Sequence, residues 1–472
     1  MKTALEVILS IIGKLSSFMG KLYWHKKIFR WTGLFVTKKF PEAKKQHKYG
    51  ILISARNEEA VIGKLLESIR NQDYPAELIT TFVIAHNCTD NTAEVVRRAG
   101  GNTVCYEWND DTKRTKGFAL QYLIEQIRKD YGIESFDGYL IFDADNLLKE
   151  DYMTRMNESF DSGETVVTSY RNTKNFDDNW ISASYGIHWL RTIRLENRAK
   201  SLFRLPNRVQ GTGYMFPSKL VRDGWKYTGL TEDRYFCGDI VTEGYNISYN
   251  NRAEFYDEQP TDIKVAMRQR LRWSKGHIEA LCGTGPKLLS NIFVTRGAAN
   301  RNEPNAPWYK KLWRNIWFRV RNLEMLTIVF PRNITLSFKK ISTVIIKILL
   351  AAMFAYECGL NSLPGEMRDI VQLFDVTSVP QKGVWQTVGL ICLFTFAYTV
   401  NTYIENIVRA AYVLIAERKR IKKMKWYKKV WYCITFPIFD LIGKLTILMA
   451  LFMKVDWKPI PHKVAVGLDK VK

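Results

Sequence analysis

Short apolar runs alternate with segments of helical periodicity over the first third of the chain, and this alternation restricts the fold more than any other feature. The apolar runs predict strands at residues 50–54, 82–85, 104–107 and 139–142. Apolar residues spaced three and four apart predict helices between them, at residues 60–71, 92–99 and 116–129. Strands and helices that alternate at this length predict an α/β fold with a mostly parallel sheet and helices on both faces.

Polar side chains follow three of the predicted strands. They lie at residues 56–58 after the first strand, 86–87 after the second and 143–145 after the fourth. The carboxyl ends of parallel strands meet at one edge of a sheet, and ligands bind there in such folds. We therefore expect these three segments to form one site.

Two acidic segments have the residue types that a transfer reaction needs. Asp143 and Asp145 stand one residue apart at a strand end, where two carboxylates can hold one hard divalent cation. A solvated turn or a helix cap is the structural alternative. Asp233 begins a predicted helix that runs to Glu243, and it suits a general base. An acidic residue that stabilises a helix dipole is the alternative there.

A third segment has the pattern of a binding surface. Gln269, Arg272 and Trp273 share one face of a helix, where a tryptophan can stack on a sugar ring and an arginine can bind diphosphate oxygens. A core tryptophan beside a surface arginine is the alternative. Lys116, followed by Gly117, suits a phosphate contact in which glycine permits close approach.

The charge of the chain indicates an anionic partner. The sequence has 70 Lys and Arg against 47 Asp and Glu, a formal net charge of +23. The basic residues cluster beside apolar segments and form no recognition motif, so we expect a lipid bilayer rather than nucleic acid. The number of cysteines is odd at seven, and no two form a C-x-x-C pair. This predicts a reducing compartment without disulfides or a zinc site.

Several segments have membrane-like patterns. Residues 1–22 predict a helix in the bilayer surface, with a spanning helix as the competitor. Residues 308–323 predict a basic interfacial helix, with an ordinary helix covering the sheet as the alternative. Residues 417–429 hold eight basic side chains and predict a cytosolic loop. Predicted spans, which pack into a multi-pass protein, lie at residues 341–356, 385–404 and 430–453.

The motifs resemble family 2 glycosyltransferases, particularly the membrane-embedded bacterial synthases of cellulose, hyaluronan, chitin and poly-N-acetylglucosamine. The residues that carry the resemblance lie at 54–59, 87–92, 116–117, 143–145, 211–213, 231–233 and 269–273. The resemblance implies a GT-A fold, a UDP-sugar donor, Mg²⁺ or Mn²⁺ as cofactor, and inversion at the anomeric carbon. If the last span crosses fully, the tail at residues 457–462 lies outside the cell, and if it bends at Pro437 and returns, the tail stays inside. The resemblance favours the return.

The resemblance also implies residue roles. Asp145 is the main metal ligand with Asp143 beside it, and Asp233 is the catalytic base. The residues that bind the donor nucleotide are Ala55, Glu58, His86, Lys116, Asp143 and Arg272. The residues that line the acceptor site are Gly211, Thr212, Glu232, Gln269 and Trp273.

One position departs from the family pattern. His86 stands where the family usually has an aspartate that contacts uracil. A neutral imidazole accepts a hydrogen bond from the base but lacks the carboxylate charge.

These expectations divide the chain into four parts. They are a membrane-associated segment with a basic linker at 1–48, a cytosolic GT-A domain at 49–290, interfacial helices at 291–340, and membrane-embedded helices with a tail at 341–472. The favoured function is a processive synthase of a β-linked polysaccharide at the plasma membrane of a bacterium. The alternatives are a transferase that adds one sugar to a lipid or short glycan, and a catalytically impaired membrane subunit. The oligomeric state stays open.

Overall fold

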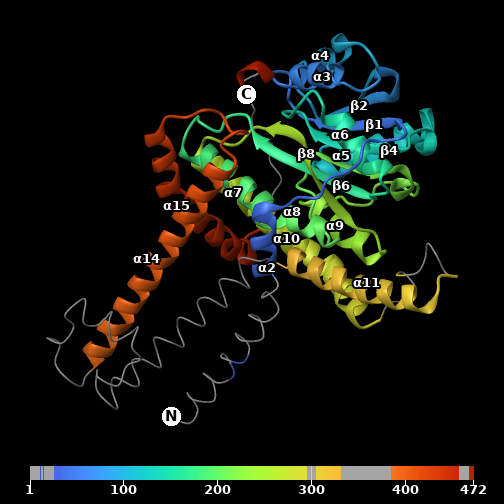
Figure 1. Ribbon diagram of the computed structural model, residues 1–472. Helices are drawn as coiled ribbons and strands as arrows, with labels where there is room; N and C mark the ends of the chain where they lie inside the picture. The colour runs from blue at the N-terminus through green and yellow to red at the C-terminus, as the bar shows by residue number, and fades with distance from the viewer. Residues whose placement is uncertain are drawn as a thin grey trace. The chain divides into compact units, whose positions relative to one another are not determined.

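The computed structural model describes residues 26–294, 305–330, 384–455 and 467–471, together with Ile11, Lys14 and Ala299. The chain divides into two compact units. One consists of Met1–Ile28 with Arg332–Tyr412, and the other of Phe29–Pro331 with Val413–Lys472. The second unit contains the sheet, whose strands are labelled in Figure 1.

The predicted strands are confirmed and form one end of an eight-stranded sheet. The order of the strands across the sheet is β3-β2-β1-β4-β7-β6-β8-β5, and the first four are parallel. The bounds of these four are β1 Tyr49–Ala55, β2 Ile79–His86, β3 Thr103–Trp108 and β4 Gly138–Asp143. The bounds of the others are β5 Leu147–Leu148, β6 Val166–Thr173, β7 Tyr214–Pro217 and β8 Ile247–Asp257.

The prediction of a mostly parallel sheet is wrong for the second half, which is mixed. β7 is antiparallel to both β4 and β6, β6 is parallel to β8, and β5 is antiparallel to β8. The direction of β7 follows from where it begins. Its first residue Tyr214 pairs with Ile141 near the carboxyl end of β4, so β7 has to run back toward the opposite edge.

The predicted helices cover both faces of the sheet. Side chains alternate along β1, so Ile51 and Ile53 pack with one helical layer while Leu52 packs with the other. The first layer consists of α3 Ile62–Arg70, α4 Thr92–Ala99 and α6 Tyr152–Asp161. The second contains α5 Lys116–Asp130 and α9 Glu232–Thr242. These two hydrophobic layers hold the carboxyl ends of the strands in place.

Further helices complete the two units. They are α2 Lys26–Phe35, α7 Trp180–Thr192, α8 Arg198–Leu202, α10 Ile263–Phe293, α11 Trp308–Val329, α14 Val384–Ala416 and α15 Trp426–Phe452. Single turns lie at Ala76–Leu78, Ile133–Ser135, Ser218–Val221 and Leu468–Lys470, and a π-helical segment joins α7 to α8 at Ile193–Asn197.

The long helix α10 packs tightly on the start of α9. A Cβ atom at Gly276 would lie 2.5 Å from the side chain of Thr231, so only glycine permits this approach. α10 also packs on α11 and α15. These contacts place the motif at 231–233 beside the motif at 269–273.

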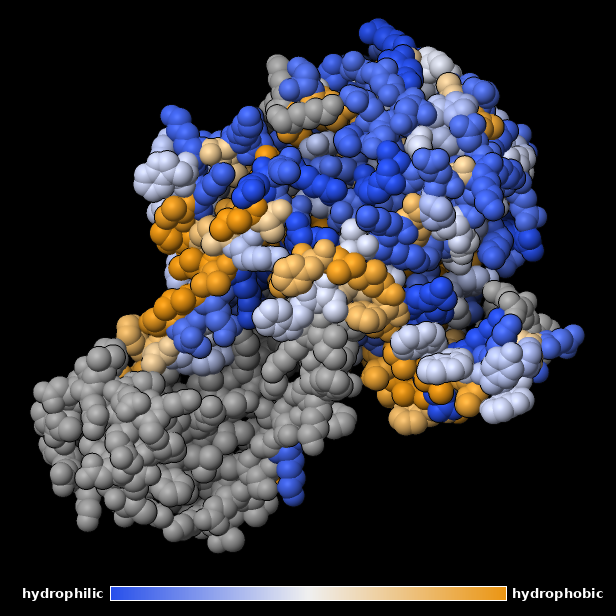
Figure 2. Space-filling view, in the orientation of Figure 1, coloured by the Kyte–Doolittle hydropathy of each residue, from blue (hydrophilic) through white to orange (hydrophobic). Residues whose placement is uncertain are grey.

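Two helices of the second unit present apolar side chains to solvent. Figure 2 shows hydrophobic residues gathered over α11 and α15, whereas the surface over the sheet is mainly hydrophilic. On α11, Trp308 is 76 % exposed and Trp313 64 %. On α15, Trp426 is 76 % exposed and Phe452 88 %. The first turns of α11 therefore expose the face predicted to be interfacial, while its last turns join the core through Met325.

Among the described residues, α15 is the one helix that is long and apolar enough to cross a membrane, and soluble core helices also meet that criterion. The expected bend at Pro437 is wrong, because α15 continues through this proline as one helix. Residues 385–404 lie within α14. The predicted segments at 341–356 and 457–462, and all but Ile11 and Lys14 of 1–22, lie outside the described residues.

Candidate active site

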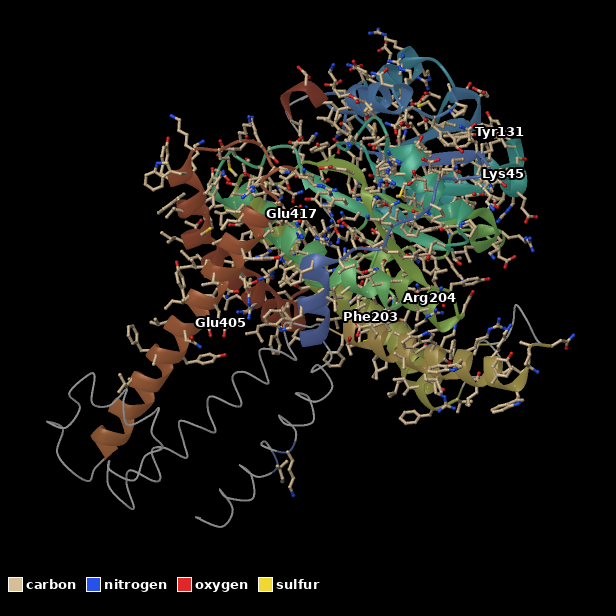
Figure 3. All side chains as sticks on the ribbon, in the orientation of Figure 1. Lys45, Tyr131, Phe203, Arg204, Glu405 and Glu417 are labelled. Carbon is tan, nitrogen blue, oxygen red and sulfur yellow. The ribbon has the colours of Figure 1, made fainter. Side chains whose placement is uncertain are left out.

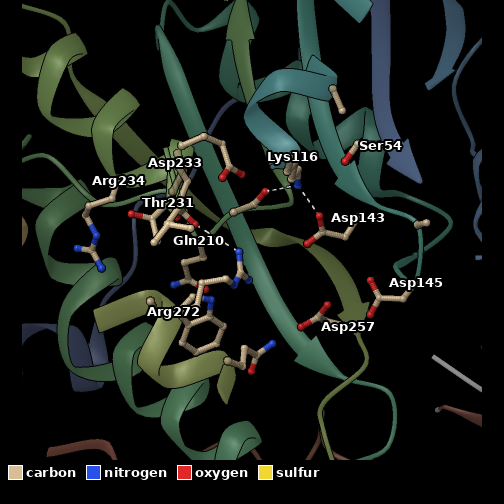
Figure 4. A pocket seen from close by; sticks show the side chains of 18 of the residues that line it. Ser54, Lys116, Asp143, Asp145, Gln210, Thr231, Asp233, Arg234, Asp257 and Arg272 are labelled. Atoms are coloured by element: carbon tan, nitrogen blue, oxygen red, sulfur yellow. Dashed lines mark hydrogen bonds and ion pairs between the residues drawn. The ribbon is translucent and has the colours of Figure 1, made fainter. Parts of the chain in front are cut away.

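One cavity of about 270 Å³ lies at the carboxyl edge of the sheet. The ends of β1, β2, β4 and β8 border it on one side, and α9 and α10 on the other (Figure 4). The predicted site residues that line it are Ala55, Glu58, His86, Lys116, Asp143, Asp145, Gly211, Glu232, Asp233, Gln269, Arg272 and Trp273. The expected convergence of strand ends is therefore a feature of the structure.

Asp143 is held by a lysine. Lys116 Nζ forms an ion pair with Asp143 Oδ1 and donates to the Gly211 carbonyl at 2.8 Å. Burial lowers the pKa of Lys116, but Asp143 and Glu232 outweigh burial, and the net pKa is raised. Lys116 therefore carries its positive charge into the cavity.

The close approach expected at Gly117 has a different partner. A Cβ atom at Gly117 would lie 2.1 Å from the Tyr227 carbonyl oxygen. The glycine therefore lets the first turn of α5 pack against the protein backbone, and its expected role in an approach to phosphate stays a prediction.

Thr212 is the predicted site residue that does not line the cavity. It is buried, its Oγ1 accepts from the Asp143 backbone nitrogen at 3.0 Å, and it donates to Asn146 Oδ1. The prediction of an acceptor contact at Thr212 is therefore corrected. The Thr212 hydroxyl forms its hydrogen bonds within the protein, and these bonds stabilise the turn that carries Asp143.

A buried polar cluster holds Asp145. Asn146 Nδ2 donates to Asp145 Oδ1 at 3.2 Å and to Asp257 Oδ1 at 2.9 Å, and the Glu258 backbone nitrogen donates to Asp145 Oδ2 at 3.0 Å. Asp257 forms a salt bridge with Arg171, whose Nε lies 2.9 Å from Asp257 Oδ2. Burial raises the pKa of Asp257 to about 6, with Arg171 opposing the rise.

Asp257 and Glu258 line the cavity, and the sequence analysis missed both. A signal was present. Phe255 and Tyr256 are two apolar residues at the end of β8, and the two acids follow them directly. This is the same order of residue types as in the segment that ends at Asp143.

The carboxylates of Asp143 and Asp145 fit a hard divalent cation. Within the described part of the chain, no three His, Cys, Asp or Glu side chains form a complete metal site. Mg²⁺ is commonly held by one or two carboxylates and completed by substrate phosphates and water. The donor set therefore fits a cation that arrives with a diphosphate.

The first turn of α9 contributes two acids in different environments. Asp233 is half-buried and lines the cavity, whereas Glu232 is only 5 % exposed. Burial raises the pKa of Glu232 to about 7, a rise that Lys116 opposes and Asp233 increases. Glu232 therefore exchanges its proton near neutral pH.

α10 contributes an aromatic side chain and a cationic side chain to the wall of the cavity. Trp273 packs edge-on against Tyr185 and Trp189, with ring centroids 6.1 Å and 5.9 Å away. Arg272 Nη1 donates to the Leu230 carbonyl at 3.3 Å. Burial lowers the pKa of Arg272, and the nearby acids Glu232 and Asp143 oppose that change. An aromatic surface and a buried cation thus lie side by side.

His86 closes the cavity at the end of β2. Its ring stacks on Trp108 at a centroid distance of 4.8 Å, and only 3 % of the residue is exposed. Burial and then Arg56 lower the pKa of His86 to about 4, so its imidazole is uncharged at neutral pH. The ring is neutral as expected, while its hydrogen bond to the base of a nucleotide stays a prediction.

Several buried polar atoms around the cavity have no hydrogen-bond partner among the described residues. They are both side-chain amide atoms of Gln210, Oε1 of Gln269 and Oγ1 of Thr231. All three residues line the cavity. Buried polar groups are normally paired, so this lining fits a ligand rich in hydroxyl groups.

The fold and this cavity define an α/β domain with a ligand site rich in carboxylates and cations. Residues 47–276 match the family model described as "Glycosyltransferase like family 2". The chain therefore carries a glycosyltransferase-like family 2 domain, and that domain contains the acidic motifs and the Gln269–Trp273 segment.

Curated relatives are similar over the same region. The "Probable glycosyltransferase YdaM" of Bacillus subtilis is 21 % identical over 248 residues, which are 49 % of this chain and 55 % of the relative. The "Poly-beta-1,6-N-acetyl-D-glucosamine synthase" of Staphylococcus epidermidis is 25 % identical over 234 residues, which are 49 % of this chain and 54 % of the relative. The similarity thus spans about half the length of these relatives.

Solved structures show weaker likenesses. A mannosyltransferase, PcManGT from Pyrobaculum calidifontis in complex with GDP-Man and Mn²⁺, is 16 % identical with a TM-score of 0.48, over 82 % of this chain and 98 % of that one. S. aureus TarS 1–349 in complex with UDP-GlcNAc is 13 % identical with a TM-score of 0.36, over 63 % and 89 %. Both TM-scores lie below 0.5.

Proposed function

We propose that this protein is a metal-dependent, inverting hexosyltransferase with a GT-A fold, which moves a sugar from a UDP-sugar to a growing β-linked polysaccharide. One observation carries the proposal. Asp143 and Asp145 at the end of β4 and Asp233 in α9 come from two distant segments and line one cavity, together with the Gln269–Trp273 face of α10. The family 2 domain supports the same conclusion.

In this proposal, the end of β4 binds the donor. Asp143 and Asp145 hold the divalent cation, which supplies positive charge to the diphosphate leaving group. Lys116 and Arg272 bind the remaining phosphate oxygens, since both place cations in the cavity. His86 faces the nucleoside, and its neutral ring accepts a hydrogen bond from the uracil.

Asp233 accepts the proton. The acceptor hydroxyl oxygen attacks the anomeric carbon from the side opposite the diphosphate, its proton passes to the Asp233 carboxylate, and the bond from carbon to diphosphate oxygen breaks. Attack from that side inverts the configuration at carbon. Glu232 is more deeply buried than Asp233. Together with Asp143 it raises the pKa of Lys116, and its own charge changes the electrostatic potential at the base.

The acceptor lies along α10. Trp273 offers an apolar ring face, and the unpaired amide atoms of Gln210 and Gln269 are available for sugar hydroxyls. Gly211 has a φ of +79°, a conformation suited to glycine, and contributes backbone to the same wall. A sugar chain therefore has both stacking and hydrogen-bonding groups to bind.

The setting of the reaction is the plasma membrane of a bacterium. α15 packs on α10 through the Arg270 guanidinium, which donates to the Phe439 carbonyl, while the opposite face of α15 exposes apolar side chains. The aromatic start of α11 suits the headgroup region. With the catalytic domain in the cytosol, the product is passed into a multi-pass membrane region.

Product analysis tests this proposal. The purified full chain is incubated with Mg²⁺ or Mn²⁺ and one UDP-sugar at a time, with UDP-N-acetylglucosamine first because of the named staphylococcal relatives. We expect a polymer that grows with time and stops forming when the metal is chelated. A product with one added sugar would establish the non-processive alternative. An absence of transfer from every UDP-sugar, while UDP still binds, would establish the impaired subunit.

A further inference from the structure

A second cavity, of about 470 Å³, lies in the same compact unit as the candidate active site. It is formed by the segment that joins α7 to α8, by Asn251 at the irregularity in the pairing of β8 with β6, and by the end of α14 with the loop that follows it. Its charged lining consists of Arg194, Arg198, Glu417, Arg418, Lys419 and Arg420. Five basic side chains therefore face one carboxylate.

Two of these arginines are already paired within the protein. Arg194 forms an ion pair with Glu417, which Figure 3 labels, and donates to the carbonyl oxygens of Leu34 and Ala416 at 2.8 Å and 3.0 Å. Arg420 donates to the Asn251 carbonyl at 2.9 Å. The internal bonds of the protein thus account for their positions.

Arg198 is different, because no hydrogen bond of its buried Nε atom within the described part of the chain accounts for its position, although the charge of Glu417 opposes the fall in its pKa that burial causes. The residue is only 7 % exposed, and its Nε atom is buried without a hydrogen-bond partner among the described residues. Burial, and then the charge of Arg194, lower the pKa of Arg198. A buried donor without a partner is unfavourable and rare, and Glu417 is the one carboxylate among the described lining residues against five basic side chains, so the cavity has an excess of positive charge and an unused donor.

We propose that this second cavity binds a phosphate-bearing anion, with Arg198 as its buried ligand and Arg418 and Lys419 as its exposed ones. The guanidinium group presents donors in a planar fork that matches two phosphate oxygens. The phosphate belongs either to a soluble phosphate ester or to the headgroup of an anionic lipid.

The site is joined to the candidate active site through consecutive residues of β6. Tyr170 donates its hydroxyl to Glu417 at 2.9 Å in the second cavity. Arg171, the next residue, pairs with Asp257 and lines the first cavity. Neighbouring residues of β6 thus connect a lining residue of the second cavity, Glu417, with a lining residue of the first, Arg171.

Thermal unfolding of the full chain in detergent tests the proposal, with sodium phosphate as the probe and sodium chloride at equal ionic strength as the reference. The variant is Arg198→Met, and the matched control is Lys423→Met, an exposed basic residue of the same loop that does not line the cavity. We expect about 10 mM phosphate to raise the Tm of the wild type and of Lys423→Met by about 3 °C. Arg198→Met should lose this rise. Phosphate bound in the first cavity would affect all three proteins alike.

A second arm separates the two sources of phosphate. The Tm is measured in nanodiscs of phosphatidylcholine with and without phosphatidylglycerol. If the Tm rises only in nanodiscs that contain phosphatidylglycerol, and the rise depends on Arg198, the phosphate belongs to a lipid headgroup. If phosphate in detergent raises the Tm, and the rise depends on Arg198, the phosphate belongs to a soluble ester. Equal responses of wild type and Arg198→Met in both arms would overturn the proposal. If Arg198→Met does not fold, the Arg418→Ala/Lys419→Ala variant decides, and a full response from it would overturn the proposal as well.

Discussion

Asn146 Nδ2 lies 2.9 Å from Asp257 Oδ1, and this hydrogen bond joins the turn after β4 to the end of β8. The same amide group donates to Asp145. The carboxylate that we propose as main metal ligand is therefore held in place by a residue far away in the sequence. Asp257 in turn depends on Arg171, so one buried network supports this edge of the cavity.

The first prediction concerns Asp257. Asp257→Ala should lower the free energy of unfolding by about 3–5 kcal/mol, because it leaves Arg171 buried without its carboxylate. Urea unfolding of the full chain in detergent measures the change. Asp223→Ala, at an exposed acid, is the control and should change stability by less than about 0.5 kcal/mol. Equal stability of the two variants would show that the Arg171–Asp257 pair does not support the site.

The second prediction concerns the pH dependence of stability. The folded state binds the Glu232 proton more tightly than the unfolded chain does, since the pKa rises from 4.5 to about 7. The stabilising contribution of this group is therefore complete below about pH 4.5 and is lost as the pH rises through 7. From pH 4.5 to pH 8, the wild type should lose up to about 3 kcal/mol relative to Glu232→Gln. Urea unfolding at several pH values measures this difference. Glu77→Gln, at an exposed position, serves as control, and parallel curves for wild type and Glu232→Gln would contradict the assignment.

The third prediction concerns the contact between α15 and α10. Gly443→Ala should destabilise the protein by about 1–3 kcal/mol, because the new Cβ would lie 2.7 Å from Arg270 Nη1. Glycine to alanine in a helix normally stabilises by about 0.5–1 kcal/mol, so the sign of the effect is diagnostic. Gly63→Ala in α3 is the control, since its Cβ would have only an ordinary contact at 3.7 Å. Thermal unfolding of both variants in detergent compares them, and stabilisation by Gly443→Ala would show that the contact is loose.

The sequence predicted the parallel half of the sheet because that half repeats one local pattern. Each of β1, β2 and β4 is buried on both faces and therefore reads as a continuous apolar run. The mixed half lacks such a pattern. β7 has only four residues, and its direction depends on where it meets β4, which is a tertiary relationship.

The sequence likewise predicted only part of the candidate site. Asp143 and Asp145 follow an obvious strand, whereas Asp257 ends a strand with polar residues at Asn250 and Asn251 and was overlooked. The position of Thr212 behind the cavity depends on its hydrogen bonds to Asp143 and Asn146, which no local pattern reveals. The local pattern of β8 thus explains the first error, and partners distant in sequence explain the second.

The central proposal is that Asp233 takes the proton of the acceptor while the other acids hold the donor. The most direct test compares sugar transfer and UDP binding in Asp233→Asn, with Asp223→Asn as a control at an exposed acid. We predict that Asp233→Asn lowers the transfer rate by at least about 100-fold and leaves the Kd for UDP within about threefold. A transfer rate equal to that of the wild type would contradict the assignment of Asp233 as the base.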